Sequence, residues 1–445
     1  MVRSFPLAFS LALTFTFTPA AVAKAKPKPA PQAPKPVPTA KAPKDALLAA
    51  ADEIVRQVAA LRGLQPKAPL QRGVLSREEI GNKLKERIGK EYTPEEVHAE
   101  ARVLKRLGLL PPDADYEKLI LDLLMEQVAG FYDPFSTKLY IADWLPLEMQ
   151  RPALAHEIEH ALQDQYFDLK RFAQPIKDDG DRQLAHSSLV EGDGTAVMLE
   201  FQAQAMGLPI DQLPDLVAQI GKQMLQGGTG QTPLFDKAPA FLKETLIFPY
   251  LGGLTFIEAL HKQQPWSKID EVFKNPPEST EQVIHPEKYT AHEHPQKIAT
   301  VPLASLGARK ELRKDVLGEL ELRILFGSKL PEDAAEKAAA GWGGDRLVAY
   351  GDPAAPDKLP TVIDLSSWDS ETDAKEAEAA ARALLAKLAG KPEAAAGQPA
   401  FYTDANGEEW LAERKGDKLL MVLGAPAATH EPVAAEIWKT WKVTK

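Results

Sequence analysis

The stretch HEIEH at residues 156–160 places two histidines and a glutamate within five residues, in a chain of 445 residues that holds only nine histidines. Side chains four residues apart project from the same face of a helix, so His156 and His160 can offer imidazole nitrogens to one cation. Two neutral imidazoles suit Zn²⁺. Glu157 lies about 100° around the helix from His156. Its carboxylate is therefore predicted to stand beside the metal, where it can take a proton from water.

The same stretch is predicted to be a buried helix, because apolar residues follow one side of it at positions 155, 158, 161 and 162. Burying two histidines and a carboxylate without partners would be costly, and a bound metal removes that difficulty. Asp164 lies four residues after His160 and is expected to orient a ligating imidazole from the second shell of the metal site. The alternative interpretation of Asp164 is an exposed carboxylate near the end of the helix.

A catalytic zinc needs a third protein ligand and an open position for water. The segment SSLVEGDGTAVMLEF offers Glu191, which lies 31 residues after His160. Because glycine weakens a helix, Gly192 and Gly194 beside this glutamate indicate that another element packs closely there. His186 is the competing ligand, although it lacks the glycine setting and points away from the face of Glu191. We expect one Zn²⁺ per chain, held by the two histidines and Glu191.

These residues need helices and a hairpin to position them. The sequence GFYDPFSTKLYIADW predicts two short strands, 131–133 and 138–142, joined by a turn at 134–137. The helix of the HEIEH stretch follows, and a second helix over 182–206 carries Glu191. Apolar spacing and capping residues predict further helices over residues 45–61, 93–107, 115–128 and parts of 209–275.

After residue 296 the sequence pattern changes from mainly helical spacing to a mixture of predicted strands and helices. DRLVAYG and TVIDLSSW are predicted strands, and a capped helix is expected to end at Gly390. Three more strands around two tight turns and a short final helix follow. We therefore predict an α+β protein with two folded parts. Residues 45–296 form a mostly helical domain with a short β-hairpin, and residues 297–445 form a smaller α+β domain with an antiparallel sheet.

The N-terminus has the features of a secretory signal peptide over residues 1–23. Arg3 gives a positive start, residues 7–17 are an apolar run, and Ala21-Val22-Ala23 matches a cleavage site. In residues 24–44, 18 of 21 residues are Pro, Ala or Lys, which predicts a disordered linker. We expect secretion to the periplasm or the medium, with no membrane span in the mature chain.

Composition excludes several classes of protein. The chain has no cysteine, so disulfides, thiolate metal sites and thiol nucleophiles are excluded. Its net charge is −10, and the basic residues of the N-terminal segment make the folded part still more acidic, which disfavours nucleic-acid binding. An apolar content of 44% is enough for two cores. The sequence does not determine the oligomeric state.

HEIEHALQD with a downstream helical glutamate resembles the gluzincin branch of the zincin metallopeptidases, of which thermolysin is the best-known member. EQVAGFYDP, ALQDQYFDL and LVEGD are also similar to an uncharacterised family of secreted bacterial HExxH proteins, over roughly residues 115–290. The resemblance implies Glu191 as the third ligand and an aspartate in the place of Asp164. It also implies an edge strand that pairs with peptide substrate, here Gly130, Phe131, Tyr132 and Asp133.

The chain departs from the gluzincin pattern at two points. Thr195 stands where these enzymes often have an aspartate four residues after the glutamate ligand, and Asp193 lies two residues after it. No motif identifies the group that stabilises the transition state. The candidates are Tyr132, Tyr166, His186, Tyr250 and His285.

The sequence thus predicts a secreted zinc-dependent peptidase that acts on a peptide or protein substrate, with Glu157 as general base. One alternative is a zincin scaffold that works as a binding protein of the cell envelope. Another is a closed structural zinc site in which His186 or an aspartate completes four protein ligands. Glu157 argues against the binding protein, because a purely structural site has no need of a base beside the metal.

Overall fold

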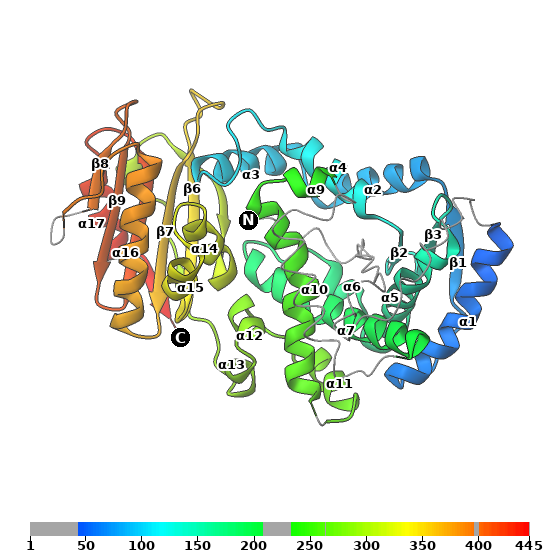
Figure 1. Cartoon of the computed structure of the whole chain (residues 1–445). Coiled ribbons are helices and arrows are strands. Elements are labelled where there is room, and N and C mark those ends of the chain that lie inside the picture. The colour runs from blue at the N-terminus through cyan, green and yellow to red at the C-terminus, as the bar shows by residue number, and fades with distance from the viewer. Residues whose placement is uncertain (1–42, 208–232, 263, 396–399, 445) are drawn as a thin grey trace, which may run out of the picture.

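The computed structural model describes residues 43–207, 233–262, 264–395 and 400–444. The predicted signal peptide lies outside these ranges, as do the linker up to residue 42 and the predicted helical residues 209–232. The described residues form a mixed α+β structure, which confirms the predicted fold class (Figure 1). Helices dominate the first part of the chain and an antiparallel sheet dominates the second.

Four helices open the described chain: α1 (Lys44–Arg62), α2 (Arg77–Glu91), α3 (Pro94–Arg106) and α4 (Tyr116–Gln127). Thr93 caps α3 in a capping box with Glu96, as its sequence predicts. Ser76 and Glu79 form the same arrangement at the start of α2. α2 was not predicted from the sequence, because its apolar face is narrow: Ile80 and Leu84 are its only buried residues.

A small sheet lies beside these helices. The predicted hairpin is confirmed as β2 (Gly130–Asp133) and β3 (Lys138–Ala142), which pair antiparallel with Tyr132 opposite Leu139. An unpredicted strand, β1 (Gln71–Leu75), pairs parallel with the other side of β3. The strand order β1-β3-β2 leaves β2 at an edge of this sheet.

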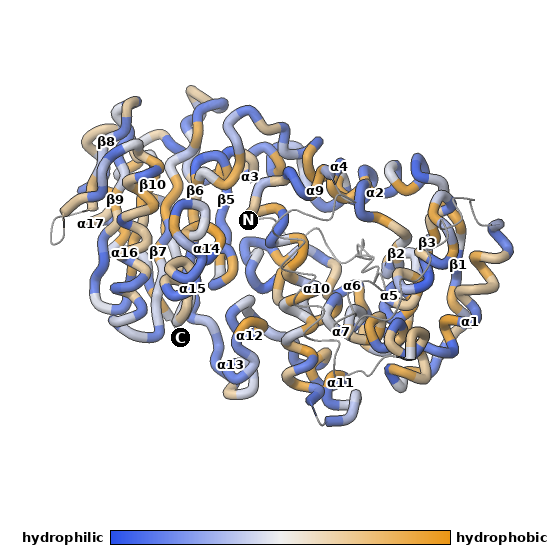
Figure 2. The backbone as a smooth tube through the Cα atoms, in the orientation of Figure 1, coloured by the Kyte–Doolittle hydropathy of each residue, from blue (hydrophilic) through white to orange (hydrophobic). Residues whose placement is uncertain are grey.

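The long helices α5 (Leu147–Phe167) and α7 (Gly180–Met206) form the centre of the first part. The helix α10 (Ala240–His261) packs along α7 and is hydrophobic over much of its length (Figure 2). By length and composition α10 could cross a membrane, but 61% of its most apolar stretch is buried against the rest of the described chain. Shorter helices complete this part: α6 (Lys170–Ala173), α9 (Pro233–Lys237), α11 (Ser267–Lys274), α12 (Thr280–Ile284) and α13 (Pro286–Thr290).

Two glycines allow α7 and α10 to approach closely. A Cβ on Gly192 would collide with the backbone of Gly253, and a Cβ on Gly253 would collide with the Ser188 carbonyl. This contact confirms the prediction that another element packs closely beside Glu191. The contact also fixes the position of α7, and therefore of its glutamate, against the rest of the core.

We expect Gly192→Ala to destabilise the protein by about 1–3 kcal/mol, because the added methyl must push two helix backbones apart. Gly89→Ala is the matched control. Gly89 is an exposed helical glycine of α2 with open space around it, so alanine there should stabilise by about 0.5–1 kcal/mol. Urea unfolding of zinc-free samples measures both changes. Equal stability of Gly192→Ala and wild type would contradict the proposed close contact.

The second part is built on a six-stranded antiparallel sheet with the strand order β5-β6-β7-β10-β9-β8. Its strands are β5 (Lys310–Asp315), β6 (Trp342–Gly351), β7 (Thr361–Trp368), β8 (Ala400–Thr403), β9 (Glu409–Lys415) and β10 (Lys418–Ala425). Its helices are α14 (Gly318–Gly327), α15 (Glu332–Ala339), α16 (Glu371–Leu388) and α17 (His430–Thr440), with the 3₁₀ turn η4 (Ala304–Leu306). β4 (Lys297–Ala299) and β11 (Lys442–Thr444) pair separately. The predicted strands and helices of this part are confirmed.

Helices cover both faces of this sheet. Alternate residues of β10 point in opposite directions: Leu419 and Met421 join the core that contains α16, and Leu420 and Val422 join the core that contains α17. Figure 1 shows α16 in front of the sheet and α17 behind it.

The two parts of the chain share one hydrophobic core. The largest cluster of buried side chains runs from α2 through α7 and α10 to α14, α16 and β10. Arg106 of α3 is buried and reaches across the boundary to the Pro360 carbonyl at 2.8 Å and to Glu408 at 2.6 Å. The change of sequence pattern near residue 296 therefore marks the change from a helical to a sheet-based architecture, and the hydrophobic core continues across it.

Candidate metal centre

Two helices bring three ligand atoms together. α5 carries His156 and His160 one turn apart, and α7 brings Glu191 opposite them. His156 Nε2 lies 2.9 Å from Glu191 Oε2 and 2.9 Å from His160 Nε2, and His160 Nε2 lies 3.5 Å from the same carboxylate oxygen. All three side chains are buried. Of the described residues, these three form one of two groups that could hold a metal ion.

The geometry of this group fits zinc. Ligand atoms about 2.0–2.1 Å from a tetrahedral Zn²⁺ lie roughly 3.3 Å from one another. The observed separations of 2.9, 2.9 and 3.5 Å bracket that value. Two imidazoles and one carboxylate also form a ligand set typical of catalytic zinc, which leaves a fourth position open.

The charges at this point attract a cation. Burial alone would raise the pKa of Glu191, but the charge of His160 and hydrogen bonds to both imidazoles lower that pKa to about 2. Burial would lower the pKa of His160, but the Glu191 carboxylate outweighs it and raises that pKa to about 9. Burial and the neighbouring His160 lower the pKa of His156. One positive charge, carried by a proton or by a metal ion, is therefore favoured between the three atoms.

A hydrogen bond from His160 to Gln163 defines how His160 faces the ligand group. The Gln163 side-chain nitrogen donates to the Val190 carbonyl at 3.2 Å and to Asp193 at 2.9 Å. Its oxygen must then face His160 Nδ1, which lies 2.8 Å away and donates to it. His160 Nε2 is thereby the nitrogen that faces the other two ligand atoms.

Glu157 lies beside the three ligands rather than among them. Its Oε2 accepts a hydrogen bond of 2.7 Å from the Tyr132 backbone N–H, and its Oε1 has no hydrogen-bond partner among the described residues. The side chain is fully buried, and this burial raises its pKa well above the ordinary value for a glutamate. A carboxylate with a raised pKa is a stronger proton acceptor than an exposed one.

The predicted substrate-binding residues Gly130, Phe131, Tyr132 and Asp133 are the residues of β2. One edge of β2 pairs with β3, and the Tyr132 N–H on the other edge points to Glu157. Gly130 is sterically required, because a Cβ there would lie 2.8 Å from the Tyr140 carbonyl oxygen. The edge of this strand that does not pair with β3 therefore adjoins the predicted base, with residues 130–132 buried.

Asp164 was expected to orient a ligating imidazole, but the structure does not place its carboxylate beside either imidazole ring. Its carboxylate accepts hydrogen bonds from the Tyr132 hydroxyl at 2.7 Å and from the Leu169 backbone N–H at 2.8 Å. Gln163, one residue earlier, takes the place beside His160. Four residues advance a helix by about 400°, so an i, i+4 stripe drifts by roughly 40° at each step. Asp164 has drifted towards β2, away from the imidazoles.

Gly194 has a steric role at the site. A Cβ on this residue would lie 3.0 Å from His156 Cε1 and 3.1 Å from His160 Cε1. The two glycines near Glu191 therefore serve different neighbours, because Gly192 faces α10 and Gly194 faces the imidazole rings.

Only one of the five candidates for transition-state stabilisation adjoins the histidines by its side chain. The ring of Tyr250, from α10, lies 5.8 Å from the His156 ring between centroids. The hydroxyl of Tyr132 is bonded to Asp164, and that of Tyr166 to the Gln65 carbonyl. His285 contacts Glu319. His186 packs against Phe172 and is not part of the ligand group, so the structure favours Glu191 over it as the third ligand.

The second group of possible metal ligands is occupied by a side chain. Glu281, Glu293 and Asp369 surround Lys288, whose ammonium lies 2.6 Å from Glu281 and 2.8 Å from Glu293. The same contacts raise the pKa of Lys288 above the ordinary value for a lysine, against the effect of burial. The protein thus places a cation of its own, the Lys288 ammonium, between these acids.

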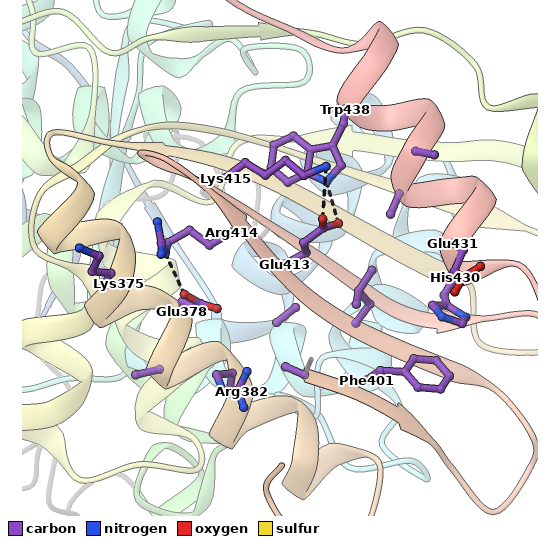
Figure 3. Close-up of a pocket in the computed structure, with 16 residues that line it drawn as sticks. Lys375, Glu378, Arg382, Phe401, Glu413, Arg414, Lys415, His430, Glu431 and Trp438 are labelled. Atoms are coloured by element: carbon purple, nitrogen blue, oxygen red, sulfur yellow. Dashed lines mark hydrogen bonds and ion pairs between the residues drawn. The ribbon is translucent and has the colours of Figure 1, made fainter. Parts of the chain in front are cut away.

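The C-terminal part carries a groove of about 860 Å³ at the β9–β8 edge of the sheet, lined by residues of both strands and of α16 and α17 (Figure 3). Its acids Glu378 and Glu413 face partners within the groove: Glu378 pairs with Arg414 at 2.8 Å, and Glu413 accepts from the Trp438 indole at 2.8 Å. Phe401 and His430 stack on each other. No group of metal ligands is found here among the described residues.

The comparison with known protein families finds a match in the C-terminal part of the chain. Residues 305–434 match a family described as a domain of unknown function, DUF8575. The match begins at η4 and ends in α17, so it covers the six-stranded sheet and none of the residues of the metal centre. No curated protein and no solved structure matches the chain.

Proposed function

We propose that this protein is a zinc-dependent peptidase. The supporting observation is the convergence of His156 Nε2, His160 Nε2 and Glu191 Oε2 within 3.5 Å of one another, beside a second glutamate that is not a ligand. Zinc bound there would supply Lewis acidity, which polarises a scissile carbonyl and acidifies water. The first two ligands come from one turn of α5 and the third from α7, so both helices are needed for the site.

The protein's own groups then have separate roles. Glu157 accepts the proton of the attacking water and returns it to the leaving amine. The Tyr132 N–H holds the Glu157 carboxylate in place at 2.7 Å. The β2 edge next to Glu157 is the candidate for pairing with an extended peptide substrate by strand addition. We also propose that the chain is secreted and acts on peptides or proteins outside the cytoplasm.

A structural zinc site is the second candidate, and burial favours it. His156 and His160 are each 1% exposed and Glu191 is 4% exposed. A structural site, however, is closed by four protein ligands, and the described group offers three. The buried Glu157 would also have no purpose beside a closed site.

The test combines zinc analysis with peptide cleavage. We expect the purified chain from residue 24 onward to contain about one zinc, to cleave members of a peptide library, and to lose this activity with a chelator. Zinc should restore it. A protein with tightly bound zinc and no hydrolysis of any peptide would support the structural site, and a protein that binds no zinc would refute both candidates.

A further inference from the structure

The N-terminal helix α1 ends at a buried arginine that reaches the metal centre. We propose that Arg62 is a positioning residue for the zinc ligand His160, which it holds through Asp193 and Gln163. This inference rests on the proposed zinc site. It extends the site to α1, whose last residue is almost 100 residues away from the nearest ligand in the sequence.

Three hydrogen bonds connect Arg62 to the ligand. Arg62 Nε donates to Asp193 Oδ1 at 2.9 Å, and Gln163 Nε2 donates to Asp193 Oδ2 at 2.9 Å. His160 Nδ1 donates to Gln163 Oε1 at 2.8 Å. Arg62, Gln163, Asp193 and His160 are each at most 1% exposed, so water does not compete for these bonds.

The direction of each bond follows from the chemistry of its members. A guanidinium has donors only and a carboxylate has acceptors only, so the Arg62–Asp193 contact has one possible polarity. Asp193 must then accept from the Gln163 amide nitrogen, which turns the amide oxygen towards His160. His160 Nδ1 must donate to that oxygen, and His160 Nε2 is left to face the metal. The Asp193 carboxylate, held in place by Arg62, thus sets the ring orientation of His160 through Gln163.

Arg62 is itself held by several elements. Besides Asp193 on α7, it contacts Asp270 on α11 at 2.8 Å and lies 3.7 Å from Glu159 on α5. Its guanidinium carbon lies 4.7 Å from the centre of the Trp266 ring. These contacts restrict the guanidinium to one place, so the carboxylate of Asp193 is restricted as well.

The chain just after Arg62 is fixed to the same helix that carries the histidines. Gly63 ends α1 in the left-handed conformation, with φ of 79°. The side-chain oxygen of Gln165, at the end of α5, accepts from the backbone N–H groups of Lys67 and Ala68 at 2.7 and 3.0 Å. The chain on both sides of Gly63 is therefore attached to α5 and α7, the helices that carry the metal ligands. Removal of α1 would take away the support of His160 rather than simply expose the metal centre.

The experiment measures zinc affinity by competition with a chromophoric chelator, and the coordination geometry by the absorption spectrum of bound Co²⁺. Arg62→Met and Asp193→Asn break the connection at two places. We expect each to weaken zinc binding by about 10–100-fold and to alter the Co²⁺ spectrum. The double variant should be no weaker than the worse single variant, since either change already disconnects Gln163 from Arg62.

Asp52→Asn is the control. It removes an exposed carboxylate of α1 that pairs with Arg72 at 2.6 Å, and it leaves every contact of Arg62 intact, so zinc affinity and the Co²⁺ spectrum should match wild type. Thermal unfolding of the zinc-free variants separates affinity from folding. If Arg62→Met or Asp193→Asn is folded and binds zinc as tightly as wild type, Arg62 has no positioning role. If wild type itself binds no zinc, the metal centre is wrong and this inference falls with it.

Discussion

Glu157→Gln is expected to lower peptide hydrolysis by roughly 10²–10⁴-fold, the usual contribution of a positioned general base. Zinc should remain near one per chain, because Glu157 is not among the three ligands. The glutamine has almost the same shape as glutamate, and its side-chain oxygen can still accept the hydrogen bond from the Tyr132 N–H. The expected loss is therefore one of proton transfer. Metal analysis and peptide turnover on the same sample measure it.

Glu159→Gln is a matched control, because Glu159 lies two residues further along α5 and is equally buried. Glu159 faces Arg62 instead of the ligand group, so its substitution should lower hydrolysis far less than Glu157→Gln. A Glu157→Gln variant that hydrolyses peptides at the wild-type rate would show that another group takes the proton.

Glu191→Gln is expected to lower both zinc content and stability. A neutral amide is a much poorer zinc ligand than a carboxylate, and the remaining two imidazoles do not make a catalytic site. Zinc at 100 times its dissociation constant stabilises a folded protein by about 2.7 kcal/mol. The variant should lose most of that increment, so its Tm should hardly respond to added zinc. Calorimetry with and without zinc measures the difference.

His186→Gln provides the comparison for Glu191→Gln. His186 lies on the same helix and is the ligand that the sequence offered as the competitor. It packs against Phe172, outside the ligand group, so its removal should leave zinc content unchanged. Zinc loss in His186→Gln, with zinc retained in Glu191→Gln, would reverse the assignment of the third ligand.

The part of the centre that helix geometry determines could be predicted from the sequence. Two histidines one turn apart needed only the 3.6-residue period, and the glycines beside Glu191 correctly indicated close packing, as the contact of Gly192 with Gly253 shows. The choice between Gln163 and Asp164 could not be made in this way. Both are one turn from His160, and only the positions of α7 and β2 decide which of them contacts the ring.

Contacts between residues far apart in the sequence could not be predicted from sequence patterns. Arg62 looks like any basic residue at the end of a helix, where a positive charge is favourable in its own right. Its contact with Asp193 joins residues 131 positions apart. β1 was missed for a similar reason: QRGVL has little alternation, and its parallel pairing with β3 depends on a strand more than 60 residues away.

Arg106 is buried in the C-terminal part, so the domain that matches the family is packed around a residue from outside the match. Gly424 of β10 has a positive φ of 70° and no side chain, and a Cβ there would collide with the Arg106 guanidinium. The sheet thus keeps a notch into which a helix from the first part inserts its arginine. We expect a chain that carries this domain without such a helix to fill the notch with another group. In this protein the surface of the sheet beside Gly424 is completed by Arg106, which lies about 200 residues before the family match begins.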